Sequence, residues 1–528
     1  MSATSAGEPS KVAAENSRLV RWWNISIAFM VFAVVAYIFA GTAADPDLWG
    51  HLRFGQDIRK AREVVTADPY SYLTSGQVWI NHEWLAEVVF SWVFDVAGSA
   101  GLVLLKLAIG LLAVLCTYLY LRRRGVRIYI AAVVSLLLAI PLLPTLRTVR
   151  PQLFTLLFFT LTMLSLSMAH HHSPLLLLAM PLYFVIWCNA HGGFIAGALI
   201  VLLWFVADSV VLLVRARRAK ELLSSSHLLK LGATLAALLA TLLNPYGLDL
   251  WRFLLRTATV PRPEITEWRP IGIISTLGAT YVVLLVTSSA ALIGSRRERP
   301  PALVMVYACI ALLPLVAVRH LSLFAVAAAV ICGEHIQDVW ERRPRLRGQS
   351  PRAGPKPRLV RLLLGLSCVL GVALIGASFR ALPCIQLEGG DYPVRAIALI
   401  KASVPQGNLA IHFNWGEYAI WHLGPQIKVS MDGRRETVYS EEMYRENLRF
   451  MTGVGQWDAL LEEHDTDLAL VKKADATYNL LRLKPEWIML YEDPLSALFV
   501  PQDSPLRQRI EATPLPALVY DGEGLCFP

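Results

Sequence analysis

Two aspartates that flank a single proline directly follow the first long apolar run of the sequence. Asp45 and Asp47 begin the stretch Asp-Pro-Asp-Leu-Trp. Carboxylates at positions i and i+2 of a turn can converge on one cation or on one hydroxyl group. Such groups act as general bases, or bind Mg²⁺ or Mn²⁺ together with a substrate phosphate. The pair by itself is common by chance, so its place after an apolar run carries the prediction.

A second acidic position, His82-Glu83, opens an amphipathic stretch that extends to about residue 97 and could lie along a membrane interface. A further acid, Glu267, belongs to a later loop. We predict that the catalytic residues are Asp45, Asp47 and Glu83. We predict that a divalent metal, Mg²⁺ or Mn²⁺, would be bound by Asp45, Asp47, His82 and Glu267.

Several basic residues occur in loops that also carry these acids. Guanidinium groups bind phosphate in a bidentate manner. The sequence therefore predicts a lipid-phosphate site, although ion pairs with the nearby acids are an equally good interpretation. The residues of this predicted site are Arg147, Arg150, Arg269, Arg319 and His320.

The elements that must position these residues are membrane spans. The chain has 528 residues, of which 55% are hydrophobic and 17% charged, whereas soluble proteins carry about 25% charged residues. Repeated apolar runs have the length of about 17–25 residues that crosses a hydrocarbon core. We predict about eleven transmembrane helices, at 23–43, 100–121, 128–146, 152–169, 174–190, 194–214, 227–244, 271–294, 301–318, 320–337 and 358–379.

Short basic tracts predict the orientation of these spans, because arginine and lysine are enriched in cytoplasmic loops. If the spans alternate from a cytoplasmic N-terminus, the basic tracts at 122–127, 215–220, 295–299 and 341–361 all fall inside. The net charge of +9 resides largely in these tracts, so we expect no nucleic-acid partner. The predicted parts are a cytoplasmic tail (1–22), a transmembrane domain (23–380) with a first outer loop (44–99), and an extracytoplasmic domain (381–528), in an inner or plasma membrane of bacterial type.

The C-terminal part alternates short apolar runs with amphipathic segments, which predicts a soluble α/β domain with strands at 408–413, 428–431, 467–471 and 487–491. Aromatic and charged residues in its turns could bind an acceptor. They could equally form its core and an ordinary Asp-Gly turn. Cys384 and Cys526 bracket this domain and could form a disulfide in an oxidising compartment. The predicted acceptor-binding residues are Trp415, Glu417, Asp432 and Arg434.

These features resemble the GT-C superfamily of membrane glycosyltransferases. In its lipid A aminoarabinose transferases and protein O-mannosyltransferases, an acid follows the first span and a second acidic motif precedes an interfacial helix. Asp45, Asp47 and His82-Glu83 stand in similar places. Residues 411–421, Ile-His-Phe-Asn-Trp-Gly-Glu-Tyr-Ala-Ile-Trp, are similar to the Trp-Trp-Asp-Tyr-Gly-type turn that opens the outer domain of oligosaccharyltransferase catalytic subunits.

The resemblance implies a GT-C-like polytopic α-helical membrane protein with a C-terminal α/β domain. It also implies transfer of a sugar from a polyprenyl-(di)phosphate donor to an acceptor on the outer face of the membrane. The alternatives are a transporter or lipid flippase and a non-enzymatic membrane scaffold with an outer binding domain. Enzymes of the usual soluble types are disfavoured, because the sequence has no Walker loop, no Gly-x-Ser-x-Gly and no Cys/His zinc spacing.

Overall fold

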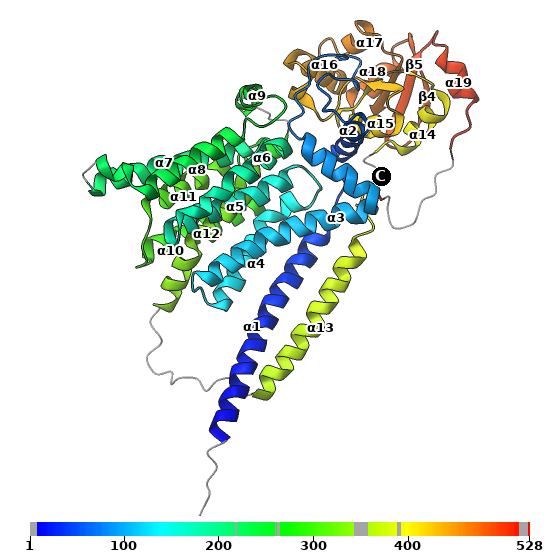
Figure 1. The fold of residues 1–528 in the computed structure, drawn as a ribbon. Coiled ribbons are helices and arrows are strands. Elements are labelled where there is room, and N and C mark those ends of the chain that lie inside the picture. Colours follow the sequence, from blue (N-terminus) through cyan, green and yellow to red (C-terminus); the bar gives the residue numbers. More distant parts are fainter. Residues whose placement is uncertain are drawn as a thin grey trace, which may run out of the picture.

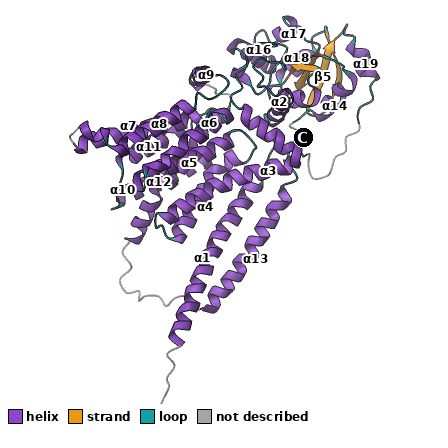
Figure 2. Cartoon of the chain, viewed as in Figure 1, coloured by secondary structure: helices purple, strands orange, loops and turns teal. Residues whose placement is uncertain are grey.

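A computed structural model describes residues 8–216, 219–258, 260, 265–342, 357–387, 392–516 and 526–528. A large helical part is joined to a smaller domain that holds all the strands (Figures 1 and 2). Most of the basic linker predicted at 341–361 lies outside the described residues.

Eight helices in the described ranges are long and apolar enough to cross a membrane. Three shorter apolar helical segments lie at Pro174–Ala190, Ser225–Ala240 and Pro301–Leu315. All eleven predicted runs therefore coincide with apolar helices, and the chain is an integral membrane protein, whereas the number of crossings stays a prediction. The eight long helices are α1 (Glu8–Ala40), α3 (Trp84–Arg123), α4 (Ile128–Leu146), α5 (Gln152–His171), α7 (Phe194–Ala216), α10 (Thr276–Gly294), α12 (Leu321–Glu341) and α13 (Pro357–Ala381).

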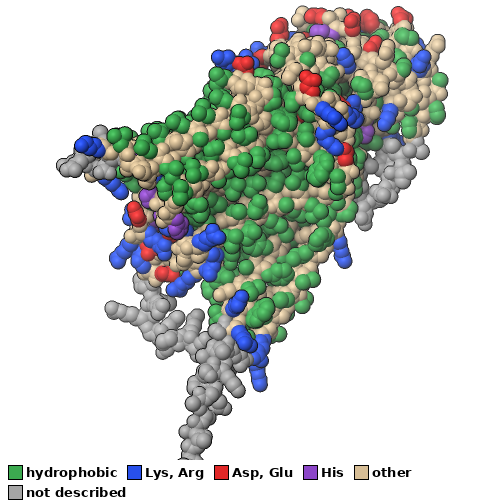
Figure 3. Space-filling model, in the orientation of Figure 1, with side chains coloured by type: hydrophobic (Ala, Val, Ile, Leu, Met, Phe, Trp, Pro, Cys, Tyr) green, Lys and Arg blue, Asp and Glu red, His purple; other side chains and the backbone are tan. Residues whose placement is uncertain are grey.

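The helices differ strongly in burial. The apolar window of α12 is 83% buried, against 11% for α13. Helix α12 packs against α4, α5 and α10, whereas α13 packs along α1 (Figure 1). A broad band of hydrophobic side chains covers the helices, and Lys and Arg gather at the end opposite the C-terminal domain (Figure 3). This distribution fits a bilayer around the band, with α12 at the centre and α13 facing lipid.

Helix α3 contains a break. Gly98 adopts φ 58° and ψ −154°, a conformation that glycine reaches without the steric cost of a Cβ atom. The break separates the stretch before residue 98 from the long apolar part of the helix. The break coincides with the boundary predicted between the stretch to about residue 97 and the following span, whereas the amphipathic character of that stretch stays a prediction.

The C-terminal domain contains one five-stranded sheet with the order β2-β1-β3-β5-β4. Strand β1 is parallel to both β2 and β3, and β5 is antiparallel to β3 and β4. The predicted strands correspond to β1–β4, and β5 was not predicted. The strands are β1 (Gly407–Ile411), β2 (Ile427–Val429), β3 (Leu468–Lys472), β4 (Trp487–Glu492) and β5 (Ser496–Pro501).

Short helices connect and cover these strands. The order of strands and helices confirms the predicted α/β domain. The helices are α14 (Val394–Ser403), α15 (Gly416–Leu423), α16 (Glu441–Thr452), α17 (Ala459–Glu462), α18 (Ala476–Arg482) and α19 (Leu506–Ala512). The disulfide that the sequence left open is present: Cys384 is bonded to Cys526 across 142 positions of sequence, with the two Cα atoms 5.1 Å apart.

Two further helices belong to the loops on the side of the C-terminal domain. They are α2 (Leu48–Ala61) and α9 (Leu248–Ala258). Helix α2 was not predicted, and it lies between α3 of the membrane part and α15 of the C-terminal domain. The first outer loop thereby connects the two parts of the molecule.

Candidate functional site

One arginine gathers three acids that are far apart in the sequence. The guanidinium of Arg150 places its Nε atom 2.7 Å from Asp45, its Nη2 atom 3.0 Å from Asp47 and its Nη1 atom 3.1 Å from Glu267. The Oδ1 atom of Asp45 also accepts the Asp47 N–H at 3.1 Å. Each nitrogen of the guanidinium therefore faces a different carboxylate.

The segment that carries Asp45 is fixed by two backbone hydrogen bonds and by the side chain of Lys106. Ala43 donates its N–H to the carbonyl of Arg147 at 2.9 Å, and Ala44 donates to the carbonyl of Gln386 at 2.8 Å. Lys106 of α3 is fully buried, and its Nζ atom donates to the Gly41 carbonyl at 3.0 Å and to the Thr42 hydroxyl at 2.6 Å. A buried ammonium needs such partners, so Lys106 holds the chain where it leaves α1.

The charges of this cluster do not cancel, because three carboxylates share one guanidinium. Burial, with the neighbouring charge of Asp45, raises the pKa of Asp47 to about 7 against the opposing effect of Arg150. Burial disfavours the charged form of Arg150, but Asp45 and Asp47 outweigh it and raise its pKa well above the ordinary value. The excess negative charge is thus relieved by proton uptake at Asp47.

A second cluster surrounds Glu83, directly before α3. One of its oxygens lies 3.5 Å from Nε2 of His191 and 3.6 Å from Nε2 of His82. Burial raises the pKa of Glu83, but basic groups around it, first His82, outweigh burial and leave the pKa below its ordinary value. Glu83 is therefore an ionised carboxylate at neutral pH.

The hydrogen bonds of His191 define where its proton lies. Its Nδ1 atom accepts the N–H of Gly193 at 2.9 Å and is 2.7 Å from the hydroxyl of Thr155. That hydroxyl in turn accepts the Trp187 indole N–H at 2.8 Å. Burial lowers the pKa of His191 to about 3, so the ring is neutral. Because Nδ1 accepts, the remaining proton sits on Nε2, the atom that lies 3.5 Å from Glu83.

Two cavities open beside these clusters. The larger has a volume of about 840 Å³ and is lined by Glu83, His191, Arg269, Arg319 and His320, among others. The smaller, of about 150 Å³, is lined by Arg150 and Glu267 on one side and by apolar residues such as Leu277 on another. Both share His191, Arg319 and His320, so they form neighbouring compartments of one site.

The predicted catalytic acids are thus divided between the two clusters. Glu83 lines the larger cavity. In the described part of the chain, the lining of these two cavities includes neither Asp45 nor Asp47, which bind Arg150 instead. Glu83 is the predicted catalytic acid that faces a space large enough for a substrate.

The predicted phosphate-binding residues are also divided. Arg269, Arg319 and His320 line the larger cavity. The Arg319 guanidinium lies 4.4 Å from the ring centroid of Trp268 and 3.9 Å from Glu267. Arg150 pairs with acids, as the alternative interpretation had it. Arg147 fixes the segment before Asp45 through its backbone.

The predicted metal ligands do not form one set. His82 lies beside Glu83, whereas Asp45, Asp47 and Glu267 surround Arg150. In the ranges that the structure describes, no group of three or more His, Cys, Asp or Glu residues has the arrangement to hold a metal ion. The side chains, as placed, do not fit the predicted Mg²⁺ or Mn²⁺ site.

The four predicted acceptor-binding residues are buried: Trp415, Glu417, Asp432 and Arg434 are at most 7% exposed. This burial favours the alternative interpretation, in which they hold the domain together. The Glu417 carboxylate accepts the Gly50 N–H of α2 at 3.1 Å. A Cβ atom on Gly433 would lie 2.3 Å from Asp47 and 2.7 Å from Glu417, so the C-terminal domain reaches the Asp47 turn.

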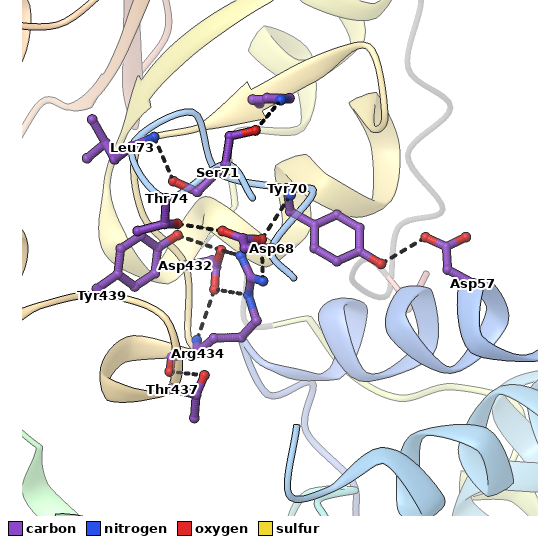
Figure 4. A network of polar contacts seen from close by, with 12 residues as sticks. Asp57, Asp68, Tyr70, Ser71, Leu73, Thr74, Asp432, Arg434, Thr437 and Tyr439 are labelled. Carbon is purple, nitrogen blue, oxygen red and sulfur yellow. Dashed lines mark hydrogen bonds and ion pairs between the residues drawn. The ribbon is translucent and has the colours of Figure 1, made fainter. Parts of the chain in front are cut away.

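Asp432 and Arg434 belong to a buried network that joins the first outer loop to the C-terminal domain (Figure 4). Arg434 donates two hydrogen bonds to Asp432, at 2.8 and 2.6 Å, and one to Asp68 of the loop at 2.6 Å. Tyr439 donates to Asp432 at 2.8 Å, and Thr74 donates to Asp68 at 2.5 Å. Both carboxylates contact the Arg434 guanidinium and each accepts a further hydrogen bond from a hydroxyl group, and such contacts are the condition for burying charges.

The sequence alone assigns no role to His191. The orientation and protonation of the His191 ring depend on Thr155 and Trp187, which come from other helices. The sequence feature that could have identified His191 is its place directly before a Gly-Gly pair, because Gly193 donates its N–H to the ring.

The comparisons with known proteins concern the fold. No family model matches the chain, and no curated protein matches it. The oligosaccharyltransferase AglB from Archaeoglobus fulgidus, solved with an inhibitory peptide and a dolichol-phosphate, has a TM-score of 0.55 and 15% identity over 86% of this chain and 69% of its own. ArnT from Cupriavidus metallidurans in the apo state has a TM-score of 0.53 and 13% identity, over 92% of this chain and 98% of its own. The same protein bound to undecaprenyl phosphate has a TM-score of 0.50 and 12% identity, over 93% of this chain and 98% of its own. The chain therefore has the fold of the GT-C membrane glycosyltransferases.

Proposed function

We propose that this protein is a membrane glycosyltransferase that moves a sugar from a polyprenyl-(di)phosphate donor to an acceptor. The observation that carries the proposal is the composition of the larger cavity, where the Glu83 carboxylate shares one lining with Arg269, Arg319 and His320. A transferase of this kind needs a base for the acceptor hydroxyl and cations for the leaving phosphate, and this lining holds both. The similar AglB and ArnT structures hold dolichol-phosphate and undecaprenyl phosphate.

In this proposal Glu83 removes the proton from the acceptor hydroxyl as the oxygen attacks the anomeric carbon. The bond from that carbon to the carrier phosphate breaks, and the phosphate leaves with the electron pair. Arg319 and Arg269 stabilise the charge that develops on it. Attack opposite the leaving phosphate inverts the anomeric centre. Asp45 and Asp47 contact Arg150 and hold it in place in this proposal, and the catalytic role that we predicted for them stays a prediction.

We further propose that the C-terminal domain lies outside the cytoplasm. Two observations support this placement. Lys and Arg gather at the opposite end of the helices (Figure 3), as the enrichment of basic residues on the cytoplasmic side requires. The Cys384–Cys526 disulfide belongs to an oxidising compartment.

The experiment that tests the function uses the full chain in lipid nanodiscs. Undecaprenyl phosphate is added first, and the complex is imaged by electron cryomicroscopy. We expect phosphate density between Arg269 and Arg319, in the larger cavity. Undecaprenyl-phosphate-linked pentoses and hexoses are then supplied, and release of the carrier phosphate is measured. An empty cavity at saturating lipid, together with no release from any donor, would overturn the proposal.

A further inference from the structure

The pairing of Arg150 resembles the coordination of a cation. All three guanidinium nitrogens face carboxylate oxygens, at 2.7 Å for Asp45, 3.0 Å for Asp47 and 3.1 Å for Glu267. Asp45 and Asp47 follow α1, whereas Glu267 comes from the loop between α9 and α10. Arg150 therefore connects two outer loops through a single positive group.

Hard divalent cations are commonly held by carboxylates that converge in this way. A guanidinium is permanently charged and planar, and it donates along fixed directions. It can thus contact three carboxylates from one side chain: Nη1 and Nη2 donate hydrogen bonds to Glu267 and Asp47, and Nε forms an ion pair with Asp45. The Asp45 side chain is only 8% exposed, so the arginine supplies a cation to a nearly buried acid that also accepts the Asp47 N–H.

Contacts outside the cluster fix the backbone of Arg150 and of the segment that carries Asp45. The carbonyl of Arg150 accepts the Leu153 N–H at the start of α5, and Pro151 follows it, which restricts its backbone. The Asp45 segment is fixed by the Lys106 ammonium. Both partners of the shortest ion pair are therefore positioned by contacts outside the cluster.

We propose that Arg150 is a built-in cation, which takes the place of a divalent metal among Asp45, Asp47 and Glu267. The protein then binds no metal ion at this cluster. The consequence for catalysis, that transfer proceeds in the presence of a chelator, rests on the proposed function. The statement about metal binding does not.

The test compares Mn²⁺ binding by the full-length wild type, Arg150→Ala, Arg150→Ala with Asp45→Asn, and Arg59→Ala. Arg59 is a matched control, because it forms an ion pair with Asp95 away from the cluster. Binding is followed by the electron paramagnetic resonance of Mn²⁺ and by thermal unfolding, which a ligand of the native state shifts upward. Neither readout requires activity.

We expect no Mn²⁺ site in the wild type or in Arg59→Ala. Removing the guanidinium frees three carboxylates, so Arg150→Ala should gain one Mn²⁺ and unfold at a higher temperature with Mn²⁺ than without it. The added Asp45→Asn change should abolish that gain. If Arg150→Ala does not fold, Mn²⁺ binding by the wild type and by Asp45→Asn alone tests the proposal. The proposal requires that neither protein binds Mn²⁺ at this cluster.

Two results would overturn the inference. One is a Mn²⁺ site in the wild type that Asp45→Asn removes. The other is a folded Arg150→Ala protein that gains no Mn²⁺. A failure of the proposed function has a different signature, namely absence of donor cleavage with and without Mn²⁺ and with EDTA, whatever the binding data show.

Discussion

The Nε2 atom of His191 lies 3.5 Å from a carboxylate oxygen of Glu83. The histidine is neutral and its other nitrogen accepts the Gly193 N–H, so it can only present a proton to Glu83. This pair joins the turn before α3 to the turn before α7. It gives the acid in the larger cavity a fixed direction, which is the property a general base needs.

Replacing Glu83 by Gln keeps the size of the side chain and removes its basic carboxylate. General bases contribute about 10²–10⁴-fold to a rate, so we expect a loss of that size in kcat for sugar transfer. Binding of undecaprenyl phosphate should persist. The exposed acid Glu442 provides the control, because Glu442→Gln lies on α16 and should transfer normally. Transfer by Glu83→Gln near the wild-type rate would exclude Glu83 as the base.

His191 is a positioning residue in this scheme. Its replacement by Ala removes the Nε2–H group that lies 3.5 Å from the Glu83 carboxylate. We expect this contact to contribute about 0.5–1.5 kcal/mol, or roughly 2–10-fold in rate. The acid limb of the pH profile of kcat/KM should move to higher pH, because ionised Glu83 loses its donor. His191→Gln can place an N–H near the same point and should recover part of both effects. A rate loss with an unmoved profile would mean that His191 serves packing alone.

The raised pKa of Asp47 should make the stability of the protein depend on pH. Its pKa is about 7 in the folded protein against 3.8 as the ordinary value, so the native state holds a proton that the unfolded state releases between these pH values. The stabilisation from this proton is complete below about pH 4 and is lost as the pH rises to 7. Asp47→Asn cannot ionise. The unfolding temperature of the wild type, relative to that of Asp47→Asn, should fall from pH 4 to 7 and then level off. A difference that is constant across this range would show that Asp47 has an ordinary pKa.

Breaking the buried Arg434 network should lower the free energy of unfolding considerably. Arg434→Ala leaves Asp68 and Asp432 buried without their cation, and removal of one partner of a buried pair costs about 3–5 kcal/mol. The exposed pair of Arg445 with Glu441 offers the comparison, since such i,i+4 pairs contribute about 0.3–0.5 kcal/mol. We expect a clear drop in unfolding temperature for Arg434→Ala and almost none for Arg445→Ala. Equal effects would contradict the structural role of the network.

The orientation can be checked with reporters that function on one side of the membrane. A C-terminal alkaline phosphatase fusion should be active, because that enzyme needs an oxidising compartment for its disulfides, and a green fluorescent protein fusion should be dim. The Cys384–Cys526 pair should also react with a maleimide only after reduction. An inactive phosphatase beside a bright fluorescent fusion would reverse the predicted topology.

The sequence predicted the helical framework well, because a bilayer imposes length and apolarity on each span. The α4 span was predicted at its observed bounds. Four strands were likewise predicted from apolar runs. Strand β5 was missed although its six residues equal β4 in length. It ends at a proline, and its pairing with β3 and β4 depends on the tertiary fold.

The site was predictable only as a set of candidates. Loop acids and arginines were identified, and pairing between them was one of two interpretations. Which arginine meets which acid depends on how the loops fold back, since Arg150 and Glu267 are 117 positions apart. Burial also could not be inferred for Asp432, whose Asp-Gly sequence is typical of an exposed turn although the residue is 0% exposed.

The contact between the first outer loop and the sheet has a consequence for biosynthesis. Tyr70 and Tyr72 exchange backbone hydrogen bonds with Val429 at the outer edge of β2, so the loop acts as an added strand on an edge that would otherwise be open to other chains. The loop leaves the ribosome early, and its partner strand follows more than three hundred residues later, by roughly the whole transmembrane domain. The loop therefore has no partner strand until β2 has been synthesised, and the complete sheet forms only when synthesis of the chain is nearly finished.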